Sequence, residues 1–234
     1  MNGKSALRAT LFGVAVVALG GPALGSSPLD AISQKDQVAA LRTALTQGAT
    51  SAVGKLGVVD GFLGNPKVRI PLPGKLAKAE KTLKIFGLGP QIDELKTSMN
   101  RAAEAAVPEA KTIFISAVRK MTVQDAASIL TGPDDAATQY FRRVTSDDLT
   151  AKFLPIVQKA TAKEDLASRY NAVAGKAASF GLIDAADASI ESYVTRKALD
   201  GLFLMMAEEE AAIRKNPIGQ ASKILQKVFG ALGH

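Results

Sequence analysis

The sequence predicts an all-α fold: a single compact multi-helix domain with one extended, proline-containing strap at about residues 68–73. Three observations support this prediction. The 234-residue chain is 47% hydrophobic and rich in alanine, the strongest helix former. Its apolar residues recur at steps of three and four, as on one face of a helix. Beyond the strap, the sequence has no longer run of alternating apolar and polar residues that would indicate a strand.

The first 25 residues have the pattern of a secretory signal peptide. Lys4 and Arg8 precede an uncharged apolar stretch at residues 9–20, and small residues lead up to Gly25. This stretch is shorter than the roughly 20 residues that a transmembrane helix needs. We therefore expect residues 1–25 to be cleaved on export. Residues 26–234 would then form the single helical domain, with no transmembrane span after cleavage.

The next part of the chain predicts helices on both sides of the strap. An apolar stripe over residues 38–56 predicts a helix that ends at Gly57. Two prolines at alternate positions of the strap exclude a helix there, so Ile70 and Leu72 should face one way and Arg69 the other. Further helices are expected at about 74–86, 92–106 and 113–121, with Pro108 kinking the chain or starting the last of them.

Capping residues and helix breakers divide the second half of the chain. Thr122 and Asp125 form a capping-box pattern before a short helix that ends at Gly132. Asp134 or Asp135 is then expected to cap a helix that runs to about residue 144.

Another helix is expected after that point, because Thr145 or Ser146 can cap it and Pro155 would distort it. The remaining helices are predicted at about 164–179, 184–215 and 218–228.

The rarest residue types exclude several kinds of chemistry. The chain has no cysteine, and its single histidine is the last residue, His234. Thiolate metal sites, iron–sulfur clusters, Cys nucleophiles and Ser-His-Asp triads are therefore excluded or nearly so. Nucleotide-binding loops and zinc-protease motifs are also missing from the sequence. We expect no metal site, no cofactor and no catalytic residue, although the question whether the protein is an enzyme stays open.

The charge of the chain favours anionic partners other than nucleic acid. The formal net charge is +7, and it falls to +5 when Lys4 and Arg8 leave with the signal peptide. The remaining basic residues are dispersed, and aromatic residues make up only 5% of the chain, so we expect no nucleic-acid binding. A mild attraction to anionic envelope polymers or membrane surfaces is the expected consequence.

Several phrases of the sequence resemble one family. They are residues 60–62, 70–73, 99–110, 136–141, 193–203 and 210–217, and they follow one another in the family's order. Together they resemble the domain-of-unknown-function 4197 family of Gram-negative bacteria. The resemblance implies an exported helical protein, and the lack of a lipobox cysteine implies a free periplasmic form. It implies no activity and no site residues.

The first candidate site lies on the alanine-rich helix at 92–106. Arg101 and Glu104 are one turn apart there, and Asn100 precedes them. One interpretation is that Arg101, oriented by Glu104 and assisted by Asn100, binds a carboxylate or phosphate. The other is a structural ion pair that ties the helix to the strap and also meets Arg69, because a half-buried arginine needs a partner.

The second candidate site combines Thr138, Arg142 and Arg143; Thr138 and Arg142 are four residues apart on one helical face, beside Tyr140 and Phe141. A guanidinium near an aromatic ring can hold an anion or stack on a planar ligand. The alternative is a surface arginine that complements a helix dipole without any ligand. The acidic run at residues 208–210 is expected to be a solvated helix face rather than a metal site.

These observations lead to three hypotheses about function. The first is a non-catalytic periplasmic or envelope-associated protein that binds a peptide, an acyl chain or an anionic envelope component in a groove beside the strap. The second is a carboxylate-based hydrolase or transglycosylase-like enzyme that uses Glu104 with Asp125 or Glu209. The third is a protein–protein interaction or structural module that docks through an amphipathic helix at residues 218–229.

Overall fold

The computed structural model describes residues 31–162, 170, 189–216 and 223–231. The predicted signal peptide lies outside these residues. Of the helix expected at 164–179, only residue 170 is described. The described helices are α1 (Gln34–Leu56), α2 (Gly74–Leu83), the π-helical turn η2 (Lys84–Leu88), α3 (Gly89–Ala106), the 3-10 turn η3 (Val107–Glu109), α4 (Ala110–Lys120), α5 (Val123–Leu130), α6 (Ala136–Thr161), α8 (Ile190–Lys215) and α9 (Lys223–Gly230).

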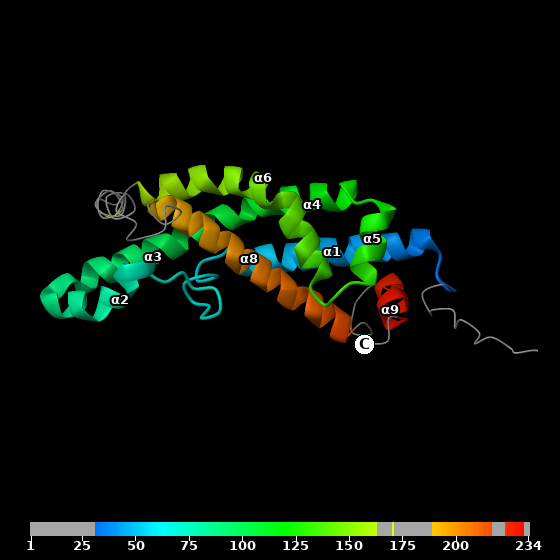
Figure 1. Cartoon of the computed structure of the whole chain (residues 1–234), viewed down its shortest axis with the longest axis horizontal. Helices are drawn as coiled ribbons and strands as arrows, with labels where there is room; N and C mark the ends of the chain where they lie inside the picture. The colour runs from blue at the N-terminus through cyan, green and yellow to red at the C-terminus, as the bar shows by residue number, and fades with distance from the viewer. Residues whose placement is uncertain (1–30, 163–169, 171–188, 217–222, 232–234) are drawn as a thin grey trace, which may run out of the picture.

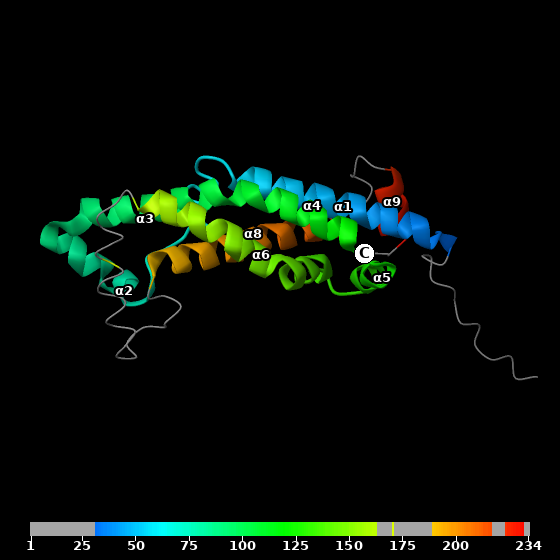
Figure 2. The ribbon, with the colours of Figure 1, turned by 90° about the horizontal axis from the view of Figure 1, so that it is seen from above.

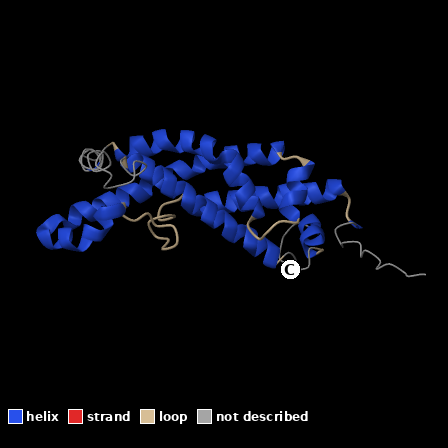
Figure 3. Cartoon of the chain, viewed as in Figure 1, coloured by secondary structure: helices blue, strands red, loops and turns tan. Residues whose placement is uncertain are grey.

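The predicted all-α fold is confirmed for these parts of the chain. They contain helices and connecting loops but no strand (Figure 3). Of the helices that the structure describes, none combines the length and apolar character needed to cross a bilayer.

Helix α8 runs through the middle of the molecule and packs against α1, α3 and α6 (Figures 1 and 2). Phe114, Phe141 and Phe203 form the aromatic centre of the core, one each from α4, α6 and α8. Their rings meet edge to face, with centroids 5.0 Å apart for Phe114 and Phe141 and 6.2 Å apart for Phe114 and Phe203. These contacts join helices that are far apart in the sequence.

The alanine-rich face of α3 is buried as the sequence predicts. Ala102, Ala103 and Ala106 are fully buried, and α3 packs against both α6 and α8. Small side chains allow neighbouring helix backbones to come close, so this face positions α3 deep in the bundle. Arg101 and Glu104 lie on the same helix, beside that face.

The strap also has the predicted form. Ile70 and Leu72 are buried, Arg69 is exposed, and the backbone between residues 69 and 73 has no regular structure. The hydroxyl of Tyr193 on α8 donates a hydrogen bond to the carbonyl oxygen of Pro71 over 3.1 Å. The strap is therefore laid across the helices and attached to α8.

One predicted break between helices is wrong. Residues 136–161 form a single continuous helix, α6, where two helices were expected. The hydroxyls of Thr145 and Ser146 donate back to the carbonyl oxygens of Phe141 and Arg142, four residues earlier, instead of capping a new helix. Such back-bonding satisfies the hydroxyl without interrupting the helix. Pro155 lies inside this helix.

Candidate functional site

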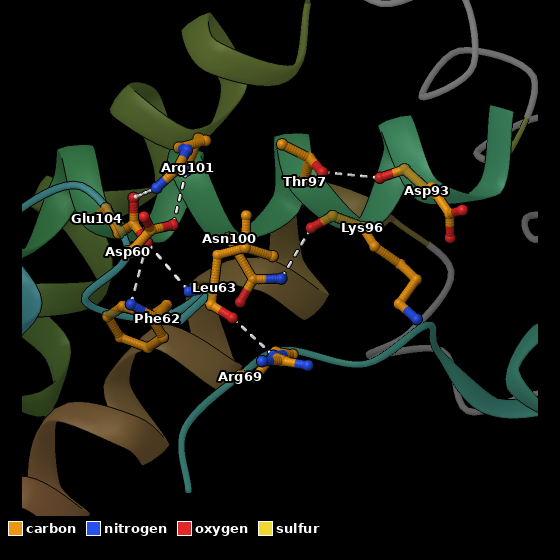
Figure 4. Close-up of polar contacts among 10 residues, drawn as sticks. All are labelled: Asp60, Phe62, Leu63, Arg69, Asp93, Lys96, Thr97, Asn100, Arg101 and Glu104. Carbon is orange, nitrogen blue, oxygen red and sulfur yellow. Dashed lines mark hydrogen bonds and ion pairs between the residues drawn. The ribbon is translucent and has the colours of Figure 1, made fainter. Parts of the chain in front are cut away.

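Asn100, the first residue of the predicted site, is used to hold the strap. Its side-chain oxygen accepts from the backbone N–H of Ile70 over 2.8 Å. Its amide nitrogen donates to the carbonyl oxygen of Ile70 at 3.0 Å. It also donates to the carbonyl oxygen of Lys96 at 2.7 Å (Figure 4). Asn100 is fully buried. It thus pairs with the strap backbone as a neighbouring strand would, and its hydrogen-bonding groups are occupied.

Glu104 holds the loop that precedes the strap. One carboxylate oxygen accepts from the backbone N–H groups of Phe62 and Leu63, each over 3.0 Å. The other oxygen accepts from Arg101 over 2.6 Å, and the Glu104 side chain is only 5% exposed (Figure 4). A buried carboxylate with three donors is fully hydrogen-bonded, so its burial is compensated.

Arg101 joins that carboxylate to the start of the loop. Its second terminal nitrogen donates to Asp60 over 2.8 Å, and the hydrogen bonds with Glu104 and then Asp60 raise the pKa of Arg101 above its ordinary value. Asp60 has a φ of 67°, in the left-handed region, which aspartate tolerates better than most residues.

Arg69 reaches the same loop from the strap. Its Nε donates to the carbonyl oxygen of Leu63 over 2.6 Å, so Leu63 donates to Glu104 and accepts from Arg69 (Figure 4). The structure therefore brings the four residues of the first predicted site, Arg69, Asn100, Arg101 and Glu104, together around residues 60–70. Each of these side chains hydrogen-bonds to the loop, to the strap or to another of the four, and Arg69 contacts the Leu63 carbonyl oxygen rather than the Arg101–Glu104 pair.

Thr138 and Arg142 contact two different parts of α8. The backbone N–H and hydroxyl of Thr138 both donate to Glu210, over 2.9 and 3.0 Å. The Arg142 guanidinium lies 4.6 Å from the centroid of Phe203 and 3.8 Å from Asp200. Arg142 therefore does have an aromatic neighbour, although it belongs to α8 rather than to its own helix.

Glu210 is the residue that sequence analysis missed. Its side chain is only 10% exposed, so the expectation of a solvated face at 208–210 is wrong for this residue. Glu210 accepts from the backbone N–H groups of Ala137 and Thr138 and pairs with Arg214 over 3.0 Å. It thus caps α6 from another helix. Asp135, expected as a possible cap, occupies the N-cap position without making a side-chain capping bond.

The carboxylates that a hydrolase would need are engaged at separate places. Glu209 pairs with Lys55, Asp125 caps α5, and Glu104 holds the loop. Asp125 accepts hydrogen bonds from the hydroxyl and then the backbone N–H of Thr122, and these lower its pKa. This confirms the predicted capping box. In the described parts of the chain, no three acidic or histidine side chains are grouped to hold a metal ion.

An open cleft of about 540 Å³ lies between α4, α5 and α6, away from the strap. Two cations, Lys120 and Arg143, and two carboxylates, Asp125 and Asp148, line it, together with Tyr140, Ser116 and other residues. The Arg143 guanidinium lies 5.5 Å from the ring centroid of Tyr140, and its distance to Asp125 is 3.7 Å. Lys120 is exposed and forms no ion pair with a described residue. Of the residues that line this cleft, sequence analysis named Arg143 in the second candidate site and Asp125 in the capping box, but it did not name Lys120.

The fold and these contacts define an all-helical domain whose loop and strap are held by buried polar side chains. A family model described as a protein of unknown function, DUF4197, matches residues 31–230. The chain therefore belongs to the domain-of-unknown-function 4197 family, as its sequence phrases indicate. No curated protein and no solved structure matches the chain.

Proposed function

We propose that this protein is a non-catalytic, exported binding protein of the periplasm that takes an anionic ligand in the cleft between α4, α5 and α6. The ligand class is a peptide or envelope polymer that carries carboxylates. The observation that carries the proposal is the pair of cations at this cleft. Lys120 has no carboxylate partner among the described residues, and Arg143 makes a 3.7 Å contact with Asp125 and lies 5.5 Å from the ring centroid of Tyr140. Both are available to a ligand anion.

The ionisation of the cleft supports binding rather than proton transfer. The pKa of Asp125 is lowered by its bonds with Thr122, so it is ionised and a poor acid at neutral pH. Burial, and then the charge of Asp125, raises the pKa of Tyr140, so the phenol keeps its proton. Its hydroxyl already donates to the carbonyl oxygen of Ala117 over 3.1 Å. Neither group is tuned to act as a general acid or base near pH 7.

Export is supported by the pattern of the first 25 residues, with its basic start, apolar stretch and small residues. N-terminal sequencing of the protein from an envelope fraction tests it. The expected mature chain begins near residue 26, and a chain that still starts at Met1 contradicts export.

The binding site is tested by calorimetric titration with hexaglutamate. The double variant K120A/R143A should bind it at least about tenfold more weakly than the unchanged protein, because two charge-assisted contacts are lost. The matched control K111A/K152A removes two exposed lysines from the same two helices, outside the cleft, and should bind normally. Equal weakening in both variants would indicate attraction by net charge alone and would overturn the cleft assignment.

Arg101→Ala separates this cleft from the predicted groove beside the strap. If R101A loses hexaglutamate binding while its circular dichroism spectrum is unchanged, the ligand lies at the strap, with Arg69 and Arg101. If R101A binds normally but unfolds more easily, the Arg101 cluster is structural and the cleft remains the site.

A further inference from the structure

Two large apolar side chains are exposed at the tip of the hairpin that α2 and α3 form. Ile85 and Phe86 are 85% and 76% exposed, the highest fractions among the large apolar residues described. Both belong to the turn η2, between the two helices. Exposing such side chains to water costs free energy, and a pair at one place indicates a contact surface.

The shape of the hairpin presents this pair to the surroundings. Gly87 has a φ of 82°, which lets the chain reverse directly after Phe86. Figures 1 and 2 both show α2 and the start of α3 at one end of the molecule's long axis, with the start of α1 at the other. The apolar pair therefore lies at an extremity.

Ion pairs between the two helices fix the hairpin. Lys84 contacts Glu80 at 3.3 Å and Asp93 at 2.8 Å, and Lys96 contacts Glu80 at 3.0 Å. These pairs join α2 and η2 to α3. They lower the pKa of both carboxylates and raise that of Lys84, so the network is fully charged at neutral pH.

The charge that remains around the tip is positive. Residues 74–96 carry five lysines and three carboxylates, a net charge of +2. Two carboxylates are taken by the ion pairs, and Glu94 is the third. Lys78 and Lys81 are exposed and form no ion pair with a described residue. The apolar pair is therefore followed, along α2, by cations that are open to an anionic partner.

A second exposed apolar pair shows what is particular to the tip. Val58 and Val59 are 53% and 75% exposed in the loop after α1. They adjoin Asp60, and the nearest lysine in the sequence, Lys55, pairs with Glu209. Exposed apolar area thus occurs at both places, but only the tip combines it with unpaired positive charge.

We propose that Ile85 and Phe86, with Lys78 and Lys81, dock the tip onto a bilayer that contains anionic phospholipid. The apolar side chains enter the boundary between head groups and acyl chains, and the lysines lie among the phosphates. Two side chains at a convex tip bury far less area than the roughly 1,000 Å² of a stable protein interface, whereas a bilayer needs no complementary groove. The inference rests on the export proposed above, which places the protein beside membranes, and it does not use the cleft.

Sedimentation with lipid vesicles tests this proposal on the purified protein. Binding to vesicles with phosphatidylglycerol should exceed binding to pure phosphatidylcholine vesicles. I85S/F86S should lower the partition coefficient on the anionic vesicles by on the order of tenfold, since the inserted apolar area is lost. K78Q/K81Q should lower it by about fivefold for each lysine on these vesicles only.

Two matched controls keep the test specific. V58S/V59S removes the other exposed apolar pair, and K111Q/K152Q removes two lysines elsewhere; neither should change vesicle binding. The proposal is overturned if the unchanged protein does not bind anionic vesicles. It is also overturned if I85S/F86S binds these vesicles as strongly as the unchanged protein. A tip variant that instead abolishes self-association in light scattering also overturns it, in favour of a contact between copies.

The cleft variant K120A/R143A distinguishes the two proposals. It should sediment with vesicles like the unchanged protein, because its cations lie outside the tip. Loss of hexaglutamate binding with normal vesicle binding supports both assignments. Unchanged hexaglutamate binding would overturn the cleft assignment, and reduced vesicle binding would overturn the tip assignment.

Discussion

Glu104 and Glu210 are two versions of the same device in different parts of the molecule. Each is a carboxylate on a helix whose side chain is no more than 10% exposed. Each accepts two consecutive backbone N–H groups from a distant segment and pairs with an arginine one turn away. They differ in their arginines: the Arg101 side chain is 37% exposed, and that of Arg214 is 2% exposed. The comparison indicates that removing the carboxylate lowers the free energy of unfolding more when its arginine partner is buried than when that arginine is exposed.

Glu210→Ala should have the largest effect. The substitution leaves Arg214 buried without its carboxylate partner. It also leaves two backbone N–H groups at the start of α6 without an acceptor. We expect the free energy of unfolding to fall by about 3–5 kcal/mol. Urea denaturation followed by circular dichroism measures it. A loss below that of Glu104→Ala would contradict the comparison.

Glu104→Ala should destabilise the protein by about 2–3 kcal/mol, as judged by the same denaturation experiment. The N–H groups of Phe62 and Leu63 lose their acceptor, which is costly for buried donors. The half-exposed Arg101 can turn to water and to Asp60, so its charge adds little to the loss. Faster hydrogen exchange at residues 60–70 than in α6 would locate the effect in the loop.

Gly201→Ala tests a second attachment of the same loop. A Cβ at this position of α8 would lie 2.8 Å from Cε1 of Phe62 and 3.1 Å from Cβ of Val68. Overpacking of this kind costs about 1–3 kcal/mol, and we expect a value near the lower end because the Phe62 ring can shift. The thermal melting temperature should fall, whereas Gly54→Ala, with nothing within 4 Å of its added Cβ, should not lower it.

Asp125→Asn should have the smallest effect, about 0.5–1 kcal/mol, because it weakens a local cap rather than a long-range contact. Since the pKa of Asp125 is lowered in the folded state, its contribution is present above the ordinary aspartate pKa of about 3.9. The contribution is lost as pH falls through the lower folded-state value. The difference in stability between D125N and the unchanged protein should therefore shrink in acid, and a constant difference would contradict this origin.

Local patterns account for most of the helices and for the strap. Alternate prolines fixed the extended strap, and spacing of three and four located α1, α3 and α4, because these signals act over a few residues. The predicted helix start at Thr145 or Ser146 was wrong because such a signal is ambiguous. A hydroxyl that can cap a new helix can also donate to a carbonyl oxygen four residues earlier in the same helix.

The candidate sites were harder to predict because their partners are distant in the sequence. Spacing placed Arg101 beside Glu104 but did not indicate that residues 62 and 63 would supply the other donors. A feature of the sequence does indicate that the Glu210 side chain faces the core. Met206, Glu210 and Arg214 continue the apolar stripe of α8 at steps of four. In α9, where docking onto a partner was predicted, Val228 is buried and the helix packs on α1.

The central place of α8 has a consequence for the order of events during synthesis. Chains are made from the N-terminus, and α1, α3 and α6 precede the helix that they all pack against. Until residues 190–215 have been translated, the apolar faces of these helices lack their partner on α8. The N-terminus of α6 also lacks Glu210, and the Phe62 loop lacks the surface of α8 on which it packs. The packing of α1, α3 and α6 on one common helix therefore becomes possible only once residues 190–215 have been translated.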